Sequence, residues 1–389
     1  MKLSERAGRI GESATMRVTR RAEELQAQGV EIISFGAGEP DFESPGAALE
    51  GAHRALDEGY TRYTPAAGAL DLREALLERY HREYAVPWTD PSQVVVTVGA
   101  KAALFELALA LFSNGDEVII PSPCWVSFPQ QAVFAGAQPI DVPASWQDGF
   151  RVRAESVIEA FSPRTRAVIL NSPSNPTGAI VAPSDLRAIV EAAADRGVVV
   201  VSDETYERFV YSDAGFASSA PLAREFPDTV VLVGSFSKTY AMTGWRIGYV
   251  LGPAELLKSV IAIQSHATSN PTSFAMRGAL AAMAGAEEDV RAMIEEFRVR
   301  RDLVVAALDA IPGVQCPVPA GAFYAFPRVA DLYREGQASS DFCELLLDEA
   351  QVAVVPGIAF GNDDHIRLSF SSSRADLEAG IARIAAAVA

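Results

Sequence analysis

Apolar and polar positions alternate along the middle of the chain between short apolar runs and helical patterns. The apolar runs, in which valine and isoleucine recur, lie at 94–98, 117–121, 138–142, 167–171, 198–201 and 230–233. Runs of this length predict buried strands, and the helical patterns between them predict a mainly parallel sheet covered by helices. We therefore expect an α/β fold with a large domain over about residues 45–285.

The pattern changes after about residue 286. It predicts a long amphipathic helix to residue 308, and further on a helix at 340–349, strands at 352–355 and 366–370, and a final Ala-rich helix. A mixture of this kind predicts a smaller α+β domain formed by residues 286–389.

Several residues suited to ligand binding stand at the ends of the predicted strands. They are Gly99, Trp125, Asn175, Asp203 and Lys238. Because ligands of open α/β sheets bind beyond the carboxyl ends of the strands, we expect these residues around one rim.

Composition draws attention to Lys238. The chain has 33 basic residues, but only four are lysines: Lys2, Lys101, Lys238 and Lys258. A partly buried lysine can lose its proton and attack a carbonyl, whereas arginine stays charged. Lys2 lies at the terminus and Lys258 in a predicted surface helix, so Lys238 and Lys101 remain as candidates.

Charge and composition also exclude several classes of function. The net charge of -17 argues against nucleic acid or an anionic membrane surface as a partner. No apolar stretch reaches about 18 residues and the N-terminus lacks a signal-peptide pattern, so we expect a cytoplasmic protein. The three cysteines are far apart and the four histidines form no short-range pair. We expect no disulfide framework and no metal site.

Two segments resemble a known family. The segment SFSKTYAMTGWRIG at 235–248 resembles the lysine motif of the class I aminotransferases, which hold pyridoxal 5'-phosphate (PLP) on a fold type I scaffold. The segment NSPSNPTG at 171–178 is close to the Asn-Pro-x-Asn-Pro-Thr-Gly motif of the same family. Further matches follow in the expected order from Ser13 to Arg367. The resemblance implies a homodimer, and a small domain in which residues 1–44 pack with residues 286–389.

The resemblance assigns roles around the cofactor ring. Lys238 would bind the cofactor aldehyde and then move the substrate α-proton. Asp203 ends a buried strand. A carboxylate there either pairs with a cationic group or caps a helix, and the resemblance implies that it pairs with the cofactor ring nitrogen. Asn175 and Tyr206 would hydrogen-bond the ring hydroxyl, and Trp125 would stack on the ring.

A phosphate site is predicted where a helix follows a strand at Gly99, Ala100 and Lys101, because amides at a helix start bind anions. The hydroxyls of Ser235 and Ser237 and the guanidinium of Arg246 could also bind the phosphate. The resemblance implies one more phosphate ligand, Tyr63 of the neighbouring subunit.

Substrate-binding residues also follow from the resemblance. Arg367 lies in a predicted strand and matches the family arginine that clamps the substrate α-carboxylate. The Gly38 backbone, Trp125 and Asn175 would line the same substrate. In the prokaryotic aspartate aminotransferase branch, which the chain resembles most, the positions that handle a second carboxylate match Ser13, Thr15 and Lys101.

The implied reaction transfers an amino group between an L-amino acid and a 2-oxo acid in a ping-pong cycle. Aspartate and glutamate are the expected donors, with oxaloacetate and 2-oxoglutarate as the oxo acids. Cys124 stands where close relatives usually carry tyrosine, and Ser269-Asn270 differs from the pattern contributed across the dimer. Aromatic amino acids, prephenate or a specialised substrate therefore remain open.

Functions of other classes are open as well. A PLP-dependent lyase of the same fold would keep the same core residues but need no amino acceptor. A PLP-sensing regulator would need a basic DNA-binding module, which the chain lacks.

Overall fold

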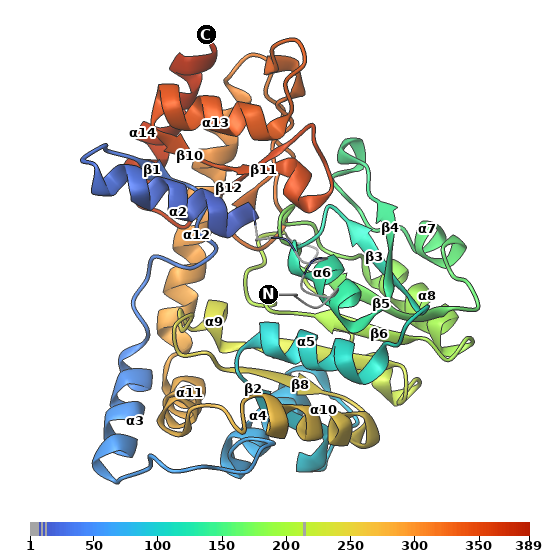
Figure 1. Ribbon diagram of the computed structural model, residues 1–389. Helices are drawn as coiled ribbons and strands as arrows, with labels where there is room; N and C mark the ends of the chain where they lie inside the picture. Colours follow the sequence, from blue (N-terminus) through green and yellow to red (C-terminus); the bar gives the residue numbers. More distant parts are fainter. Residues whose placement is uncertain (1–7, 9–10, 12–13, 213–214) are drawn as a thin grey trace.

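A seven-stranded sheet forms the centre of the large part of the molecule (Figure 1). The computed structural model describes residues 8, 11, 14–212 and 215–389. The strand order is β2-β8-β7-β6-β5-β3-β4, and only β8 runs antiparallel to its neighbours. The strands are β2 (Val94–Thr97), β3 (Glu117–Ser122), β4 (Gln138–Pro143), β5 (Thr165–Asn171), β6 (Val199–Asp203), β7 (Val230–Ser235) and β8 (Gly248–Leu251).

Helices cover both faces of this sheet because successive valines and isoleucines of each strand point to opposite sides. One hydrophobic cluster contains Val95, Val231 and their neighbours with α5 (Ala100–Leu111), α6 (Ser127–Ala135) and α10 (Ala254–Ala267). The other contains Val94, Val230 and their neighbours with α4 (Leu70–Tyr84), α7 (Ala154–Glu159), α8 (Pro183–Ala194) and α11 (Ser273–Gly285), and α3 (Gly46–Asp57) packs on α11. The predicted α/β fold is confirmed.

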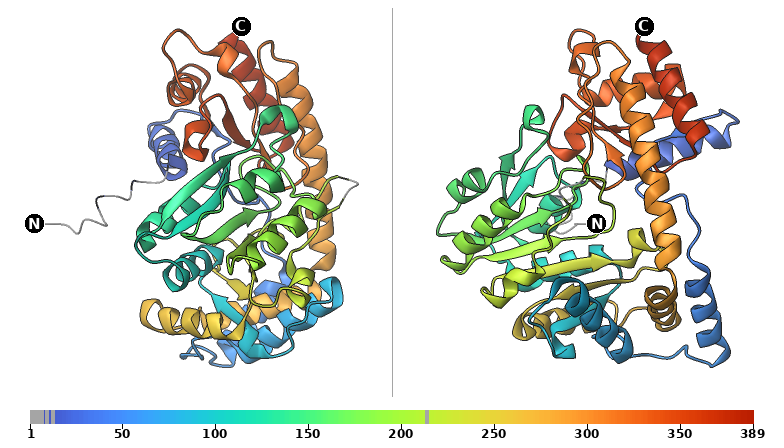
Figure 2. Two further views of the ribbon diagram at one scale, coloured as in Figure 1. Left: turned by 90° about the vertical axis from the view of Figure 1, so that its right-hand side faces the viewer. Right: turned by 180° about the vertical axis from the view of Figure 1, so that it is seen from behind.

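The C-terminal part forms a second hydrophobic core, to which the long helix α12 (Glu287–Asp309) contributes. This helix is orange in Figures 1 and 2. Its strands β11 (Val355–Pro356), β12 (Ile366–Ser369) and β9 (Tyr324–Ala325) form an antiparallel sheet. Helices α13 (Ser339–Ala350) and α14 (Arg374–Val388) pack against each other.

Part of the described N-terminal segment packs with this C-terminal part. Strand β1 (Ile33–Ser34) pairs in parallel with β10 (Val352–Ala353). Ala22 of α2 (Ala14–Ala27) contributes to a cluster with Leu347 of α13. The first and last parts of the chain therefore form one body above the large sheet (Figure 2).

Short helices complete the structure. They are α9 (Phe236–Thr239) and the 3-10 helices η1 (Pro91–Gln93), η2 (Trp146–Asp148), η3 (Ala220–Arg224), η4 (Ala330–Leu332) and η5 (Gly357–Phe360).

An aromatic cluster joins the two parts just beyond β6. Tyr206 and Phe209 pack edge-on against Phe323, with ring centroids 5.3 Å and 5.4 Å away. Phe297 of α12 stacks on Phe323 at 5.3 Å. Because Asp203 ends β6, this cluster fixes the position of that strand end relative to the C-terminal part.

The backbone just before β8 leaves the extended conformation at Arg246. Strand β8 starts only at Gly248, and Arg246 has a φ of 56°. This left-handed conformation ends the extended backbone, and the Arg246 guanidinium lies against Gly99. Strand β8 therefore begins only after the turn that places the Arg246 side chain beside Gly99.

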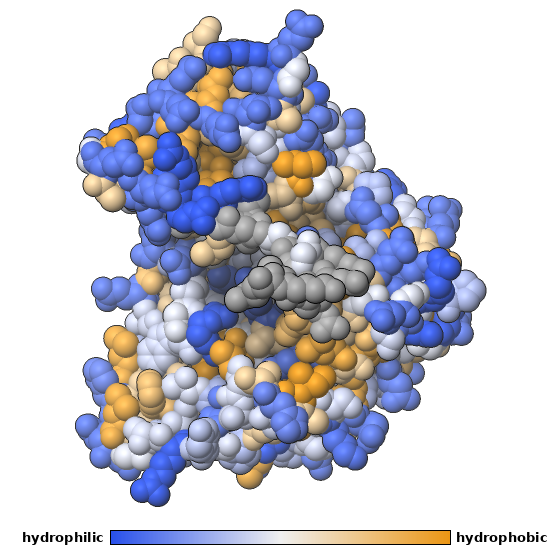
Figure 3. Space-filling model, in the orientation of Figure 1, coloured by the Kyte–Doolittle hydropathy of each residue, from blue (hydrophilic) through white to orange (hydrophobic). Residues whose placement is uncertain are grey.

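Hydrophilic residues make up most of the face shown in Figure 3. Among the described helices, none contains a stretch long and apolar enough to cross a membrane. All three cysteines are free thiols, and the described residues include no His, Cys, Asp and Glu cluster that could hold a metal ion.

The fold predicts that Gly234→Ala destabilises the protein. Gly234 pairs with Tyr249 across β7 and β8, and an added Cβ would overlap the buried Tyr249 ring. We expect a loss of about 1–3 kcal/mol in the free energy of unfolding, measured by urea denaturation. Gly244 is exposed with open space around it, so Gly244→Ala should change stability by less than about 0.5 kcal/mol. Equal effects of the two changes would contradict the packing of these strands.

Candidate active site

A cavity of about 530 Å³ lies at the carboxyl ends of the parallel strands, between the sheet and the C-terminal part. It brings together twelve of the residues predicted from the sequence. They are Gly38, Ala100, Lys101, Trp125, Asn175, Asp203, Tyr206, Ser235, Ser237, Lys238, Arg246 and Arg367. Four of the five residues predicted for the rim therefore line one cavity: Trp125, Asn175, Asp203 and Lys238.

Lys238 occupies the turn between β7 and β8. Ser235 ends β7 and caps α9 by accepting a hydrogen bond from the Ser237 amide at 3.1 Å, which places Lys238 in the short helix beside the cavity. Its Nζ donates to the Gly38 carbonyl oxygen. Burial lowers the pKa of Lys238 to about 8, although the Glu39 carboxylate acts in the opposite direction. The amine can therefore exchange its proton near neutral pH.

Asp203 is 5% exposed at the end of β6. One carboxylate oxygen accepts the Thr205 amide at 3.1 Å, and in the described part of the chain no lysine or arginine forms an ion pair with it. Burial raises the pKa of Asp203 to about 6, and the hydrogen bonds to Thr205 lower it. A buried carboxylate in this setting favours a cationic group of a ligand.

Arg367 is buried on β12 and carries a charge without an acidic partner among the described residues. Its Nη1 donates to Asn175 Oδ1 at 3.0 Å and its Nη2 to the Gly36 carbonyl at 2.9 Å. Its Nε has no partner in the described structure, and burial lowers its pKa. Neutral acceptors hold the guanidinium in place, so the charge remains available to an anion such as a carboxylate.

The start of α5 and Arg246 form a cradle for an anion. Gly99 caps the helix with a φ of 78°, and a side chain there would press against the Arg246 guanidinium. Arg246 Nη1 donates to the Thr243 carbonyl at 2.8 Å, which fixes the guanidinium. Free amides at the helix start, the guanidinium and the hydroxyls of Ser235 and Ser237 suit a phosphate group.

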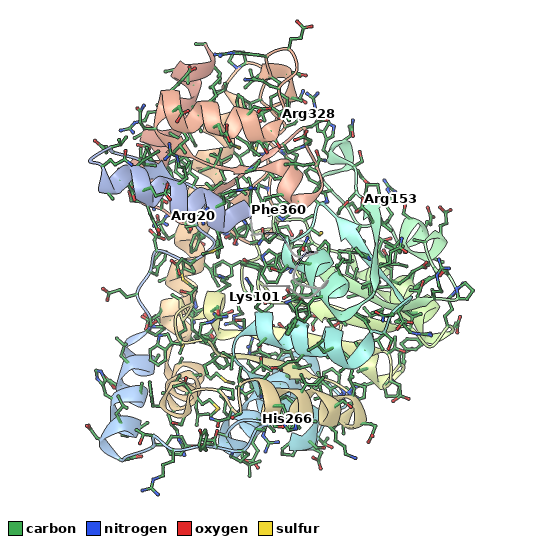
Figure 4. All side chains as sticks on the ribbon, viewed as in Figure 1. Arg20, Lys101, Arg153, His266, Arg328 and Phe360 are labelled. Carbon is green, nitrogen blue, oxygen red and sulfur yellow. The ribbon has the colours of Figure 1, made fainter. Side chains whose placement is uncertain are left out.

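Lys101 and Trp125 lie side by side at the cavity wall. Lys101 Nζ is 5.0 Å from the Trp125 ring centroid, a cation-π contact. Burial lowers the pKa of Lys101, and the Arg246 charge lowers it further. Figure 4 shows Lys101 near the start of α5, with Phe360 of the C-terminal part above it.

Some predicted residues lie elsewhere. Gly99 stands directly behind Arg246 and does not itself line the cavity. Tyr63 is 88% exposed and does not line the cavity of its own chain. Ser13 lies outside the described residues, and of Thr15 the structure describes only the backbone in α2. Ser269 is exposed on the surface beside Asn270.

The cavity also contains residues that the sequence analysis missed. They include Met16, Leu104, Glu39, Thr243 and Tyr324. Thr243 donates to Glu39 at 2.6 Å, and the Tyr324 hydroxyl lies 2.8 Å from that of Tyr206. Tyr324 stands in the apolar run GAFYAF, where its tyrosine is the available signal, because a buried hydroxyl needs a partner.

The fold and the cavity are those of an α/β enzyme that brings a half-buried amine, a buried carboxylate and two guanidinium groups together around one cavity. The sequence profile described as "Aminotransferase class I and II" matches residues 30–384. The chain belongs to this family, which confirms the resemblance seen in the sequence.

Individual relatives agree along the whole chain. An aspartate aminotransferase of Geobacillus stearothermophilus is 43% identical and covers 99% of this chain and 98% of its own. A probable aspartate/prephenate aminotransferase of Aquifex aeolicus is 44% identical, covering 98% of this chain and 97% of its own. The structure of Thermus thermophilus aspartate aminotransferase with maleate has a TM-score of 0.93 at 40% identity and covers 100% of both chains.

The lowered pKa of Lys238 leads to a direct test. Acylation of the cofactor-free protein, followed by peptide mass spectrometry, should show Lys238 reactivity that rises with pH and reaches half of its plateau near pH 8. In the urea-unfolded chain the same peptide should need a more alkaline pH, because an unperturbed lysine titrates near about 10.4. Identical profiles in the folded and unfolded chains would contradict the burial of this amine.

Proposed function

We propose that the chain is a PLP-dependent aminotransferase that transfers the amino group of aspartate or glutamate to 2-oxoglutarate or oxaloacetate by a ping-pong cycle. The observation that carries the proposal is the meeting of Lys238, Asp203 and Arg367 in one cavity. Bound PLP would supply an electron sink for the substrate α-carbon.

The residues present fit this cofactor. Lys238 offers an amine that loses its proton near pH 8, and Asp203 offers a buried carboxylate without an ion-pair partner in the described structure for a protonated ring nitrogen. Tyr206 and Asn175 would hydrogen-bond the ring hydroxyl, and Trp125 would cover the ring. The cradle at the start of α5, with Ser235, Ser237 and Arg246, would hold the phosphate.

The chain's own residues would then bind the substrate and move its proton. Arg367 would fix the α-carboxylate through its guanidinium, with Asn175 and the Gly38 backbone beside it. This orientation would hold the α-carbon near Lys238. An amine with a pKa of about 8 is suited to take up the α-proton and return it, because a general base works best near the operating pH.

Lys101 supports the choice of dicarboxylate substrates. Its ammonium lies at the cavity wall without an acidic partner among the described residues, and it would bind the distal carboxylate together with Ser13 and Thr15. The Geobacillus relative is named for aspartate, and the Thermus structure holds the dicarboxylate maleate. The Aquifex relative is named for aspartate and prephenate, so prephenate is an outcome for the substrate test.

A dimer would complete this site. Tyr63 is 88% exposed in the single chain, although the backbone of its loop is fixed: Gln264 Nε2 donates to Val96 and Ala66, and Ser273 Oγ donates to Tyr60. We propose that Tyr63 reaches the phosphate of the partner subunit, with Ser269-Asn270 at the same interface. Residues 45–285 would form the large domain, and residues 1–44 with 286–389 the small domain, in a cytoplasmic enzyme.

Replacement of Lys238 tests the reaction. With PLP present, the protein should form oxaloacetate and glutamate from aspartate and 2-oxoglutarate, and Lys238→Ala should lose at least about three orders of magnitude in kcat, because proton transfer at the α-carbon has no base. Coupled detection of oxaloacetate measures both. Full activity of the variant would refute the role of Lys238. Consumption of aspartate without any amino acceptor would instead indicate the lyase reaction.

Replacement of Lys101 tests the substrate class. Lys101→Met should lower kcat/KM for aspartate by about 10- to 100-fold, because one charged hydrogen bond to the distal carboxylate is removed. Activity with phenylalanine should change far less. Lys258→Met is the matched control, since Lys258 is an exposed lysine of α10. Equal losses for aspartate and phenylalanine would contradict a distal-carboxylate role.

A further inference from the structure

A pair of buried tyrosines links the two parts of the cavity. Tyr206 follows β6 of the large sheet, and Tyr324 lies on β9 of the C-terminal part. Their hydroxyl oxygens are 2.8 Å apart, and their rings meet edge-on at 5.8 Å. Tyr206 is 5% exposed and Tyr324 1%, and both line the cavity.

The proton on each hydroxyl decides the direction of this bond. A tyrosine hydroxyl has one proton to donate and lone pairs to accept. If Tyr206 donates its proton to the ring oxygen of the cofactor, it has none left for Tyr324. Tyr324 must then be the donor to Tyr206, which makes a chain of two hydrogen bonds that point toward the cofactor.

The surroundings of Tyr324 hold its hydroxyl in this role. The Arg367 guanidinium lies 4.5 Å from the centre of the Tyr324 ring. A Cβ added to Gly38 would be 3.1 Å from the Tyr324 hydroxyl, so the backbone there fits closely around this oxygen. The positive charge over the ring favours donation by the phenol, and a hydrogen bond accepted by Tyr206 strengthens the one that Tyr206 donates.

We propose that Tyr324 is a positioning residue that acts through Tyr206: it directs the Tyr206 proton to the cofactor ring oxygen and strengthens that hydrogen bond. The inference rests on the proposed PLP-dependent function. It also places Arg367, the predicted clamp of the substrate carboxylate, in contact with the same hydrogen-bond chain.

Burial raises the pKa of both phenols, and the Arg367 charge acts in the opposite direction on both. Asp203 raises the pKa of Tyr206 further. Both hydroxyls therefore keep their protons at neutral pH, as the chain of donors requires.

The test is a pH titration of the visible absorbance of the PLP-loaded enzyme, which reports on the protonation of the bound cofactor. Tyr206 stabilises the anionic ring oxygen, so a weaker Tyr206 bond raises the spectral pKa. Tyr324→Phe should raise it by about 0.5 to 1 pH unit, the effect of one hydrogen bond. The substitution keeps the ring under Arg367.

A double variant separates action through Tyr206 from an independent effect. In the Tyr206→Phe background, Tyr324→Phe should cause no further shift, because the hydroxyl through which it acts is gone. Tyr80→Phe is the matched control: its hydroxyl is also buried and lies 3.2 Å from another tyrosine hydroxyl, that of Tyr249, but it does not line the cavity. Its spectral pKa should equal that of the unmodified enzyme.

The outcomes distinguish this inference from the proposed function. An unchanged spectral pKa in Tyr324→Phe, or the same shift with and without Tyr206, would overturn the role of Tyr324 while leaving the PLP-dependent function intact. A shift of the same size in Tyr80→Phe would also overturn it. An unmodified protein that forms no visible band with PLP would overturn the proposed function, and with it the inference.

Discussion

Lys238, Asp203 and Arg367 line one cavity, where Asp203 and Arg367 are buried and Lys238 is half-buried, and in the described part of the chain none of them forms an ion pair. Burial of an unpaired charge costs several kcal/mol, and the protein meets this cost with neutral partners: the Gly38 carbonyl, the Thr205 amide and the Asn175 side chain. These partners fix the charged groups without neutralising them. The cavity therefore keeps its charges available to a ligand with an anionic group and a cationic group.

The two hydrophobic cores place these groups. The large sheet ends at Asp203 and Ser235, and the antiparallel sheet of the C-terminal part carries Arg367 and Tyr324. Tyr206 belongs to the core of the C-terminal part although it follows a strand of the large sheet. A shift of one part relative to the other would therefore change the hydrogen bonds of the cavity.

Much of the site could be predicted because its residues stand in local motifs at strand ends. Lys238, Asp203 and Asn175 each follow a short apolar run, and the topology brings such ends together. Tyr324 and Glu39 were missed because their place in the cavity depends on packing between distant segments, which no local pattern records. The Arg246 side chain was predicted, but its left-handed backbone was not, and its guanidinium lies against Gly99 from a distant segment. The domain boundaries and the role of each site residue stay predictions.

The most direct test of the central claim is an absorbance scan of the purified, PLP-loaded protein before and after a single amino acid is added, with no oxo acid present. An aminotransferase completes half of its cycle under these conditions. We expect aspartate and glutamate each to remove the visible band and produce a stable band at shorter wavelength, with the oxo acid released in equal amount to the enzyme. An unchanged spectrum with every amino acid tested would contradict the account.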